Sequence, residues 1–144
     1  MQKVAEDLFE GEAGDIVLIG GRSRETGAIV FPYPTGADRA HYERIRLQQE
    51  GTLWSWTVQR FPPKAPFNGP ATPDAFRPFA VGYVELADQI IVESRLLCDD
   101  FAELRIGMPM RITSEAYRTD ASGEPVFTYA FRPIALEKDR LDED

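Results

Sequence analysis

Residues 90–117 decide the fold expected of this chain, and they read IIVESRLLCDDFAELRIGMPMRITSEAY. Residues 90–97 and 110–117, at the two ends of this stretch, have the apolar and β-branched composition that predicts β-strands. Between them, residues 99–104 predict one helical turn, because leading aspartates cap free N–H groups and favour the positive end of a helix dipole. Five short strands with a helical turn between the third and the fourth are the order of an OB-fold barrel.

Three more segments supply the other strands of the expected barrel, namely residues 51–58, 79–86 and 126–131. Alternation in the first of them puts Trp54, Trp56 and Val58 on one face, for packing in the barrel or at an interface. Periodicity alone supports a small all-β barrel or sandwich, and the placement of the helical turn favours the OB-fold. We therefore expect an all-β chain with minor α content and an OB-fold domain over residues 51–135.

The two ends of the chain are predicted to lie outside the barrel. Residues 1–14 predict a short helix, because Val4 and Leu8 repeat at the i, i+4 spacing and Gly11 offers a C-terminal stop. A helix this short has to dock on the rest of the chain or on a partner to be stable. Residues 136–144 predict an acidic, solvated tail.

Residues 15–50 predict a hairpin followed by a less regular stretch. Two β-branched runs, 16–19 and 28–31, flank the polar and glycine-bearing residues 20–27, which is the signature of a hairpin. Within residues 35–50 a turn of helix competes with a strand, and we expect irregular structure followed by a strand.

The charge and apolar content of the chain exclude several classes of partner. The chain has 144 residues, 24 acidic and 16 basic side chains, and a formal net charge of −8. Such a chain lacks the electrostatic footprint of a nucleic-acid binder, and charge does not draw it to an anionic membrane. Its apolar runs fall far short of the roughly 20 residues that span a bilayer. Acids stand where a signal peptide needs a basic and then an apolar region, so we expect a cytoplasmic protein.

The rarest residues limit the catalytic chemistry that the chain can perform. One cysteine and one histidine exclude an intrachain disulfide, an all-cysteine metal site and most histidine-dependent triads in a single subunit. We interpret Cys98 as a small core residue rather than a reactive thiol, and His41 as a surface histidine rather than a base. The sequence around Ser23 lacks the second glycine of a nucleophile elbow. Asp99 and Asp100 are adjacent, so their side chains diverge and capping is the favoured role.

A long proline-rich loop is the best candidate for a ligand-binding surface. Residues 61–77 contain five of the eleven prolines, and loops of this length inside a small domain are usually functional. The loop combines cations and aromatics on a stiff backbone that costs little entropy to order. The alternative is a loop that only packs over the barrel end. The candidate ligand-binding residues are Arg60, Phe61, Lys64, Phe67 and Arg77.

Several of these segments resemble one family. Residues 51–58 and 61–67 are similar to the first OB strand and loop of OB-fold proteins that carry an N-terminal rubredoxin-like zinc ribbon and occur alongside thiolases and acyl-CoA enzymes. Residues 78–86, 104–110 and 129–133 resemble its later signatures. The resemblance runs from the N-terminal segment to Pro133, and the order and number of its motifs make a chance match improbable.

The chain departs from this family at the metal ligands. The family pattern places a Cys-x-x-Cys knuckle in the first hairpin, where this chain has Ser23 and Thr26, and no second cysteine pair follows between Pro32 and Gly51. Hydroxyls cannot replace zinc thiolates, which bind as anions. We therefore expect residues 15–50 to be a degenerate ribbon without metal.

The resemblance implies an accessory function rather than catalysis. Such proteins are non-catalytic subunits that bind a thiolase or a thiolase-like aldolase in fatty-acid, steroid or aromatic acyl-CoA metabolism, and that help to hold the acyl-CoA. The alternative is a stand-alone acyl-CoA or lipid-binding module, which would bind a CoA ester without a partner. Single-strand nucleic-acid binding rests on fold analogy alone and conflicts with the charge. An enzyme in its own right would need turnover that depends on His41.

Overall fold

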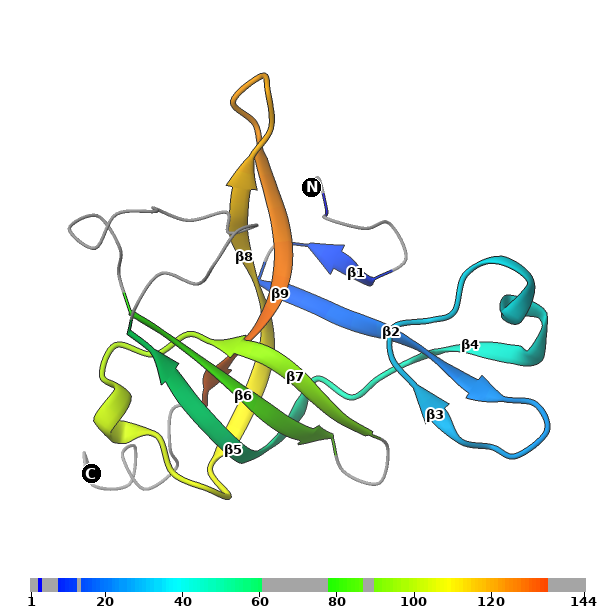
Figure 1. The fold of residues 1–144 in the computed structure, drawn as a ribbon, viewed down its shortest axis with the longest axis horizontal. Coiled ribbons are helices and arrows are strands. Elements are labelled where there is room, and N and C mark those ends of the chain that lie inside the picture. The colour runs from blue at the N-terminus through cyan, green and yellow to red at the C-terminus, as the bar shows by residue number, and fades with distance from the viewer. Residues whose placement is uncertain (1–2, 4–7, 13, 61–77, 87–89, 135–144) are drawn as a thin grey trace.

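The computed structural model describes residues 3, 8–12, 14–60, 78–86 and 90–134, and it contains a small sheet and a closed barrel (Figure 1). The barrel strands follow one another in the order β5-β6-β7-β9-β8, and β8 pairs back with β5. Among the pairings of these described barrel strands, β7 with β9 is the parallel one and the others are antiparallel. This all-β barrel confirms the OB-fold expected from the sequence. The strands are β5 (Glu50–Gln59), β6 (Phe79–Leu86), β7 (Ile90–Leu96), β8 (Pro109–Thr119) and β9 (Pro125–Pro133).

The helical turn predicted between the third and fourth barrel strands is present as a single 3₁₀ turn, η2 (Phe101–Glu103). Asp100 stands at its N-cap, and its Oδ1 accepts a hydrogen bond from the backbone N–H of Ala102 at 2.9 Å. Gly107 has a φ of 90°, which lets the chain turn into β8. The aspartate therefore caps the turn, as its position in the sequence predicted.

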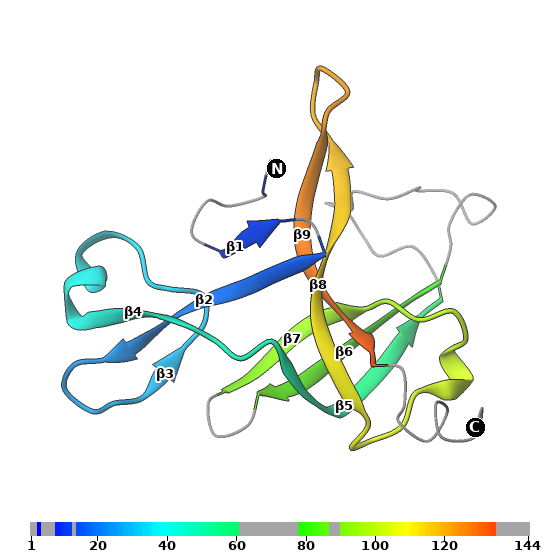
Figure 2. The same ribbon diagram turned by 180° about the vertical axis from the view of Figure 1, so that it is seen from behind.

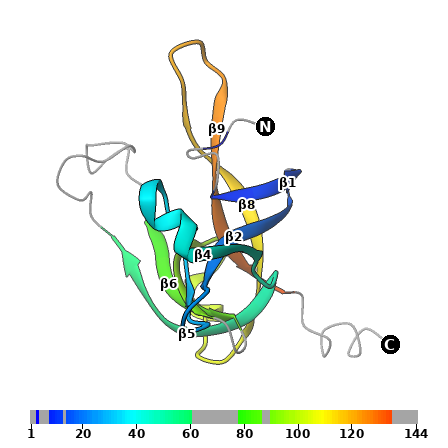
Figure 3. The same cartoon turned by 90° about the vertical axis from the view of Figure 1, so that its right-hand side faces the viewer.

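A small antiparallel sheet precedes the barrel, with β2 (Asp15–Ser23) as its central strand. Strand β2 pairs with β1 (Phe9–Glu12), with the short β3 (Ile29–Val30) and with β4 (Tyr42–Arg46). The hairpin expected in this region is confirmed. A 3₁₀ helix, η1 (Gly36–His41), precedes β4, so the expected strand is also confirmed. Viewed from the side, β2 and β4 lie in front of β5 and β6 (Figure 3).

The helix predicted over residues 1–14 is wrong for the described residues 9–12. Residues 9–12 form β1, and the part of the chain that the structure describes contains no α-helix. Gly11 has a φ of 112°, and a Cβ there would lie 2.4 Å from the carbonyl oxygen of Asp15. Phe9 pairs with Leu18 and is fully buried. Tight hairpin geometry and burial of Phe9 thus override a local helical spacing. Residues 1–2, 4–7 and 13 lie outside the described residues.

The prediction that Trp54 and Trp56 share one face is also wrong. The register of β5 against β6 shifts between Leu53 and Ser55, so Trp54 is the extra residue of a β-bulge. Leu53 is buried and Trp56 packs against the core, whereas Trp54 is mostly exposed. Gly82 lies beside this bulge, where a Cβ would approach the carbonyl oxygen of Ser55 to 2.6 Å.

The small sheet and the barrel share one hydrophobic core. Ile16 and Leu18 of β2 are fully buried in the same cluster as Leu53 and Phe131 of the barrel. Figure 2 shows β2 running up to β8 from behind. The two parts therefore cannot be separated without exposing apolar surface to water. No helix in the described ranges is long and apolar enough to cross a membrane.

Candidate functional site

The proline-rich loop predicted to bind ligand leaves and re-enters the barrel at adjoining strand ends. Gln59, the last residue of β5, is paired with Phe79, the first residue of β6. Arg60 follows β5 and is exposed. The other predicted ligand-binding residues lie outside the described residues, so their role stays a prediction. They are Phe61, Lys64, Phe67 and Arg77.

Four large apolar side chains are exposed on one region of the barrel surface, and we call them the apolar strip: Trp54, Tyr83, Ile91 and Ile106. Trp54 is 56% exposed and Ile106 is 71% exposed. Folded proteins expose single apolar side chains routinely, but a group of them on neighbouring segments marks an interaction surface. The strip is therefore the candidate functional site that the structure adds.

Backbone pairing brings the members of the strip together. Leu53 exchanges backbone hydrogen bonds with the segment after η2, through Gly107 N–H at 2.7 Å and the carbonyl of Met108 at 2.9 Å. Ile106 directly precedes Gly107, and Trp54 directly follows Leu53, so each lies one residue from this backbone contact. On the other side of β5, Ser55 is paired with Tyr83 of β6.

Alternation along β6 and β7 turns the remaining members of the strip outward. The core residues Val84 and Val92 are paired with each other, so their neighbours Tyr83 and Ile91 point to the opposite face. The strip thus crosses four adjacent segments of the barrel surface.

Acidic side chains border the strip. Tyr83 Oη donates a hydrogen bond to Glu93 Oε2 at 2.9 Å, and this bond to a carboxylate raises the pKa of Tyr83 above its usual value. Glu85 lies on the same outer face, opposite Ile91. Aromatic and aliphatic groups with a polar rim are the usual composition of a protein–protein contact.

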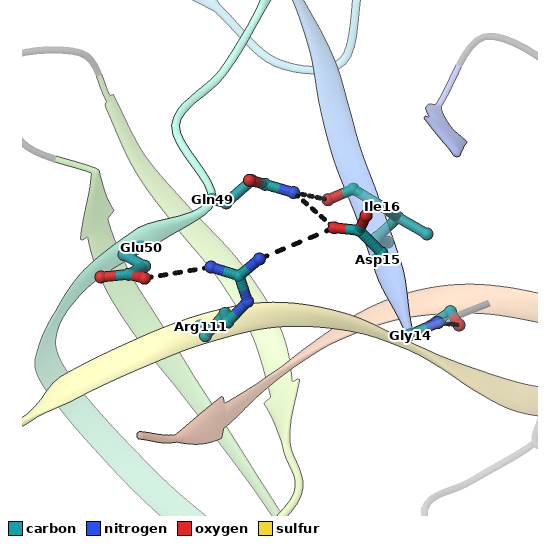
Figure 4. Close-up of polar contacts among 7 residues, drawn as sticks. Gly14, Asp15, Ile16, Gln49, Glu50 and Arg111 are labelled. Carbon is teal, nitrogen blue, oxygen red and sulfur yellow. Dashed lines mark hydrogen bonds and ion pairs between the residues drawn. The ribbon is translucent and has the colours of Figure 1, made fainter. Parts of the chain in front are cut away.

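A second polar cluster, the junction network, ties the small sheet to the barrel (Figure 4). Arg111 of β8 donates to Glu50 at 3.0 Å and forms an ion pair with Asp15 of β2 at 3.6 Å. Gln49 Nε2 donates to Asp15 Oδ1 at 3.1 Å and to the carbonyl of Ile16 at 3.0 Å. These contacts fix the orientation of β2 on the barrel.

Ser23 and Thr26, which stand where the resemblance implies that metal ligands are lost, accept hydrogen bonds from the backbone of their own turn. Ser23 Oγ accepts from the N–H groups of Glu25 at 3.2 Å and Thr26 at 3.1 Å. Thr26 Oγ1 accepts from the N–H of Ala28 at 3.2 Å. The described residues contain no group of three or more His, Cys, Asp or Glu side chains that could hold a metal ion. Zinc therefore does not fit this donor set, because neutral hydroxyls are poor zinc ligands.

The other residues weighed from the sequence do not assemble into one site. His41 is exposed on the small sheet, where its carbonyl accepts from the N–H of Arg24. Cys98 packs against the barrel core, and burial, together with nearby acids, raises the pKa of its thiol above the usual value. A raised pKa disfavours the reactive thiolate. The hydroxyl oxygen of Ser23 accepts backbone hydrogen bonds within its own turn.

Sequence reasoning missed the apolar strip and the junction network for different reasons. A bulge cannot be located from alternation, which therefore put Trp54 on the same face as Trp56, for packing in the barrel or at an interface. Ile106 carries a usable signal, since it is an apolar residue between Arg105 and Gly107 in a predicted turn. The partners in the junction network are distant in sequence, and no local pattern joins Asp15 to Arg111.

Comparison with known proteins identifies the barrel. Residues 45–115 match the family described as ChsH2, C-terminal OB-fold domain. This part of the chain is similar to that family. The ChsH2-type segment contains all four residues of the apolar strip, and it confirms the resemblance inferred from the sequence motifs.

Two relatives extend this likeness over most of the chain. The DUF35 domain-containing scaffold protein of Pyrococcus furiosus is 28% identical over 122 residues, which are 81% of this chain and 83% of the relative. A solved structure, the Ltp2-ChsH2(DUF35) aldolase, has a chain that matches with a TM-score of 0.58 and 19% identity. That match covers 81% of this chain and 84% of the other, and at this identity it concerns the fold.

Proposed function

We propose that this chain is a non-catalytic accessory subunit that binds a thiolase or a thiolase-like aldolase in acyl-CoA metabolism. The ChsH2-type barrel supports this function, together with one relative that is named a scaffold protein and another that is part of an aldolase. The proposed acyl-CoA metabolism is that of fatty acids, steroids or aromatic compounds.

The apolar strip is the observation that carries the proposal. Trp54 is exposed because a bulge turns it outward, although Trp56 in the same strand packs inward. Bulges re-aim side chains, and tryptophan is enriched among the residues that dominate binding energy at interfaces. We assign the strip to the thiolase-like subunit as its occupant.

The non-catalytic role agrees with where the reactive side chains lie. His41 belongs to the small sheet, whereas Cys98 packs at the barrel core with its thiol held protonated by burial. A nucleophile and its base have to lie within hydrogen-bond reach to act together, and these two residues belong to different parts of the fold.

The loop at residues 61–77 is the proposed point of contact with acyl-CoA. Arg60, Lys64 and Arg77 would meet the phosphates of CoA, and Phe61 and Phe67 would meet apolar parts of the ligand. Arg60 supports this role because it is exposed at the strand end where the loop begins. The alternative function, a stand-alone acyl-CoA or lipid-binding module, would use the same residues without a partner.

The small sheet is, in this proposal, a degenerate ribbon without metal. We propose the boundaries 15–50 for this ribbon, 51–135 for the OB-fold domain and 136–144 for an acidic tail, in a cytoplasmic protein. The hydrogen bonds of Ser23 and Thr26 support the loss of zinc. Their hydroxyl oxygens accept the backbone N–H groups of a turn that zinc-bound thiolates would otherwise organise.

A binding measurement with matched variants tests the proposed function. Trp54→Ala should weaken binding to the co-expressed thiolase-like subunit at least tenfold, about 1.4 kcal/mol. Tyr117→Ala serves as the control, since Tyr117 is an exposed aromatic on β8 outside the strip. Equal affinities for both variants would overturn the assignment of the strip. Calorimetric binding of a CoA ester to the isolated chain, with no partner required, would favour the alternative function.

A further inference from the structure

The outer face of β6 carries two aromatic side chains, and the strand beside it differs in what it offers to each. Ala80 and Val84 are fully buried, so alternation turns Phe79 and Tyr83 to the outside of the barrel. Strand β7 is paired with β6 along its whole length, and the two strands lie side by side in Figures 1 and 2. The outward side chains of β7 are therefore the neighbours of both rings.

At Phe79 the chain supplies its own cation. The guanidinium carbon of Arg95 on β7 lies 4.5 Å from the centre of the Phe79 ring, within the range of a cation–π contact. Arg95 Nη2 also forms an ion pair with Glu115 Oε1 on β8 at 3.3 Å. One arginine is thus held by an aromatic face and a carboxylate together, which suits its planar and permanently charged group.

At Tyr83 the ring and the carboxylates are present without such a cation. Glu93 of β7 is paired with Tyr83, and Glu85 of β6 is paired with Ile91, so the two carboxylates are diagonal neighbours on this outer face. Both glutamates are exposed. Among the described residues, no arginine, lysine or histidine forms an ion pair with Glu85 or Glu93, and none lies over the Tyr83 ring.

The Tyr83 ring and Glu93 are ordered before any partner binds. Tyr83 Oη donates to Glu93 Oε2 at 2.9 Å, and the backbone carbonyl of Glu93 accepts from Tyr129 Oη on β9 at 3.0 Å. Tyr83 is nevertheless 41% exposed, so part of its side chain remains open to a partner. Groups that are already ordered lose little entropy on binding, which favours this position as a contact point.

We propose that the occupant of the apolar strip inserts an arginine side chain against the Tyr83 ring, between Glu85 and Glu93. The identity of the occupant, the thiolase-like subunit, rests on the proposed function. Arginine fits better than lysine, because a guanidinium stacks on an aromatic ring and donates to two carboxylates at once. Arg105 precedes Ile106 at the other end of the strip, so the acidic β6–β7 end sets the direction in which the occupant binds.

A titration of the isolated chain tests the arginine position without any partner. N-acetyl-arginine amide should shift the backbone amide resonances of Tyr83, Glu85 and Glu93 in a saturable way. N-acetyl-citrulline amide, which has nearly the same shape and no charge, should not shift them. The double variant Glu85→Gln/Glu93→Gln should abolish the shifts. Equal shifts with both compounds, or no shifts at these three amides, would overturn the proposal.

The same double variant separates this proposal from the proposed function. It should weaken binding to the co-expressed thiolase-like subunit about tenfold, and high salt should remove the difference because it screens exposed charges. The control Glu25→Gln/Glu124→Gln removes two other exposed negative charges and should bind normally.

The two proposals fail in different ways in these measurements. Normal binding by both double variants, together with weak binding by Trp54→Ala, would overturn the arginine contact and leave the proposed function in place. If the arginine compound binds the isolated chain but the thiolase-like subunit does not, the arginine position is supported and the proposed function is wrong.

Discussion

At the scale of single residues, hydroxyls and ion pairs hold the small sheet in the absence of any metal-ligand set among its described residues. Ser23 accepts two backbone N–H groups, and Thr26 accepts a third. Glu10 on β1 reaches across β2 to Arg44 at 3.0 Å and Arg46 at 2.6 Å on β4. These hydrogen bonds and ion pairs stabilise the turn after β2 and join β1 to β4.

Ser23→Ala should lower the free energy of unfolding by about 1 kcal/mol, because it leaves the N–H groups of Glu25 and Thr26 without their acceptor. Thermal denaturation measures this change. Thr35→Ala is the matched control, since the Thr35 hydroxyl makes no cap bond to η1. A loss of stability on adding a zinc chelator to the unaltered protein would contradict the metal-free turn.

Glu10→Gln should show a stability loss that depends on pH. The hydrogen bond from Arg44, aided by the charge of Arg46, holds the pKa of Glu10 below its usual value. Stabilisation by a lowered carboxyl pKa is present above the unfolded-state value, about 4.3, and is lost as pH falls through the folded-state value.

Chemical denaturation of the Glu10→Gln variant and the unaltered protein should therefore differ by roughly 0.5–1 kcal/mol at pH 7 and converge in acid. Glu12→Gln, an exposed position at the end of the same strand, is the control. A difference that stays constant from pH 7 to pH 3 would show that Glu10 does not act through its charge.

The residue types alone showed where metal-ligating cysteines are missing. They did not show which side chains are exposed on the surface proposed to bind a partner. The absence of a cysteine pair at Ser23 and Thr26 is visible in the sequence, and so is the capping role of Asp100. The exposure of Trp54 is not visible, because it depends on one extra residue in the register between β5 and β6.

At the scale of elements, two β-bulges place aromatic residues on the barrel surface. The register shifts at Trp54 in β5 and at Tyr117 in β8, and both side chains are substantially exposed. The five barrel strands and the capped turn between the third and the fourth could be predicted, because they follow from alternation and local capping. The strand at residues 9–12 could not, because its helical spacing is overridden by a glycine turn and the burial of Phe9.

The bulge in β5 predicts opposite effects for its two tryptophans. Trp56→Ala should destabilise the fold by about 2–4 kcal/mol, because Trp56 packs against the core. Trp54→Ala should change stability by less than about 0.5 kcal/mol, since surface substitutions are usually that small. Urea denaturation followed by circular dichroism compares them, and similar losses for both would place Trp54 inside the barrel.

At the scale of the whole molecule, the small sheet and the barrel form one structural unit. Ile16 of β2 is buried in the core cluster that contains Leu53 and Phe131, and Arg111 links Asp15 to Glu50 on the surface. A shared core couples the orientation of the small sheet to the barrel. An accessory subunit built this way would present both parts to its partner in one fixed arrangement.

Ile16→Ala should therefore destabilise the barrel as well as the small sheet, by about 2–5 kcal/mol. Both tryptophans of the chain lie in β5, so their fluorescence reports on the barrel alone. The fluorescence and circular dichroism transitions should shift together to a lower midpoint. A fluorescence midpoint that stays in place while circular dichroism shifts would mean that the two parts unfold independently.

Isolation of the native complex tests the central claim most directly. The chain, affinity-tagged at its natural expression level, should co-purify with a thiolase-like subunit, and the loss of the chain should lower the amount or activity of that subunit. Size-exclusion chromatography should then show one species that contains both proteins. A thiolase-like subunit that is equally abundant and active without this chain, together with a tagged chain that elutes alone, would contradict the accessory function.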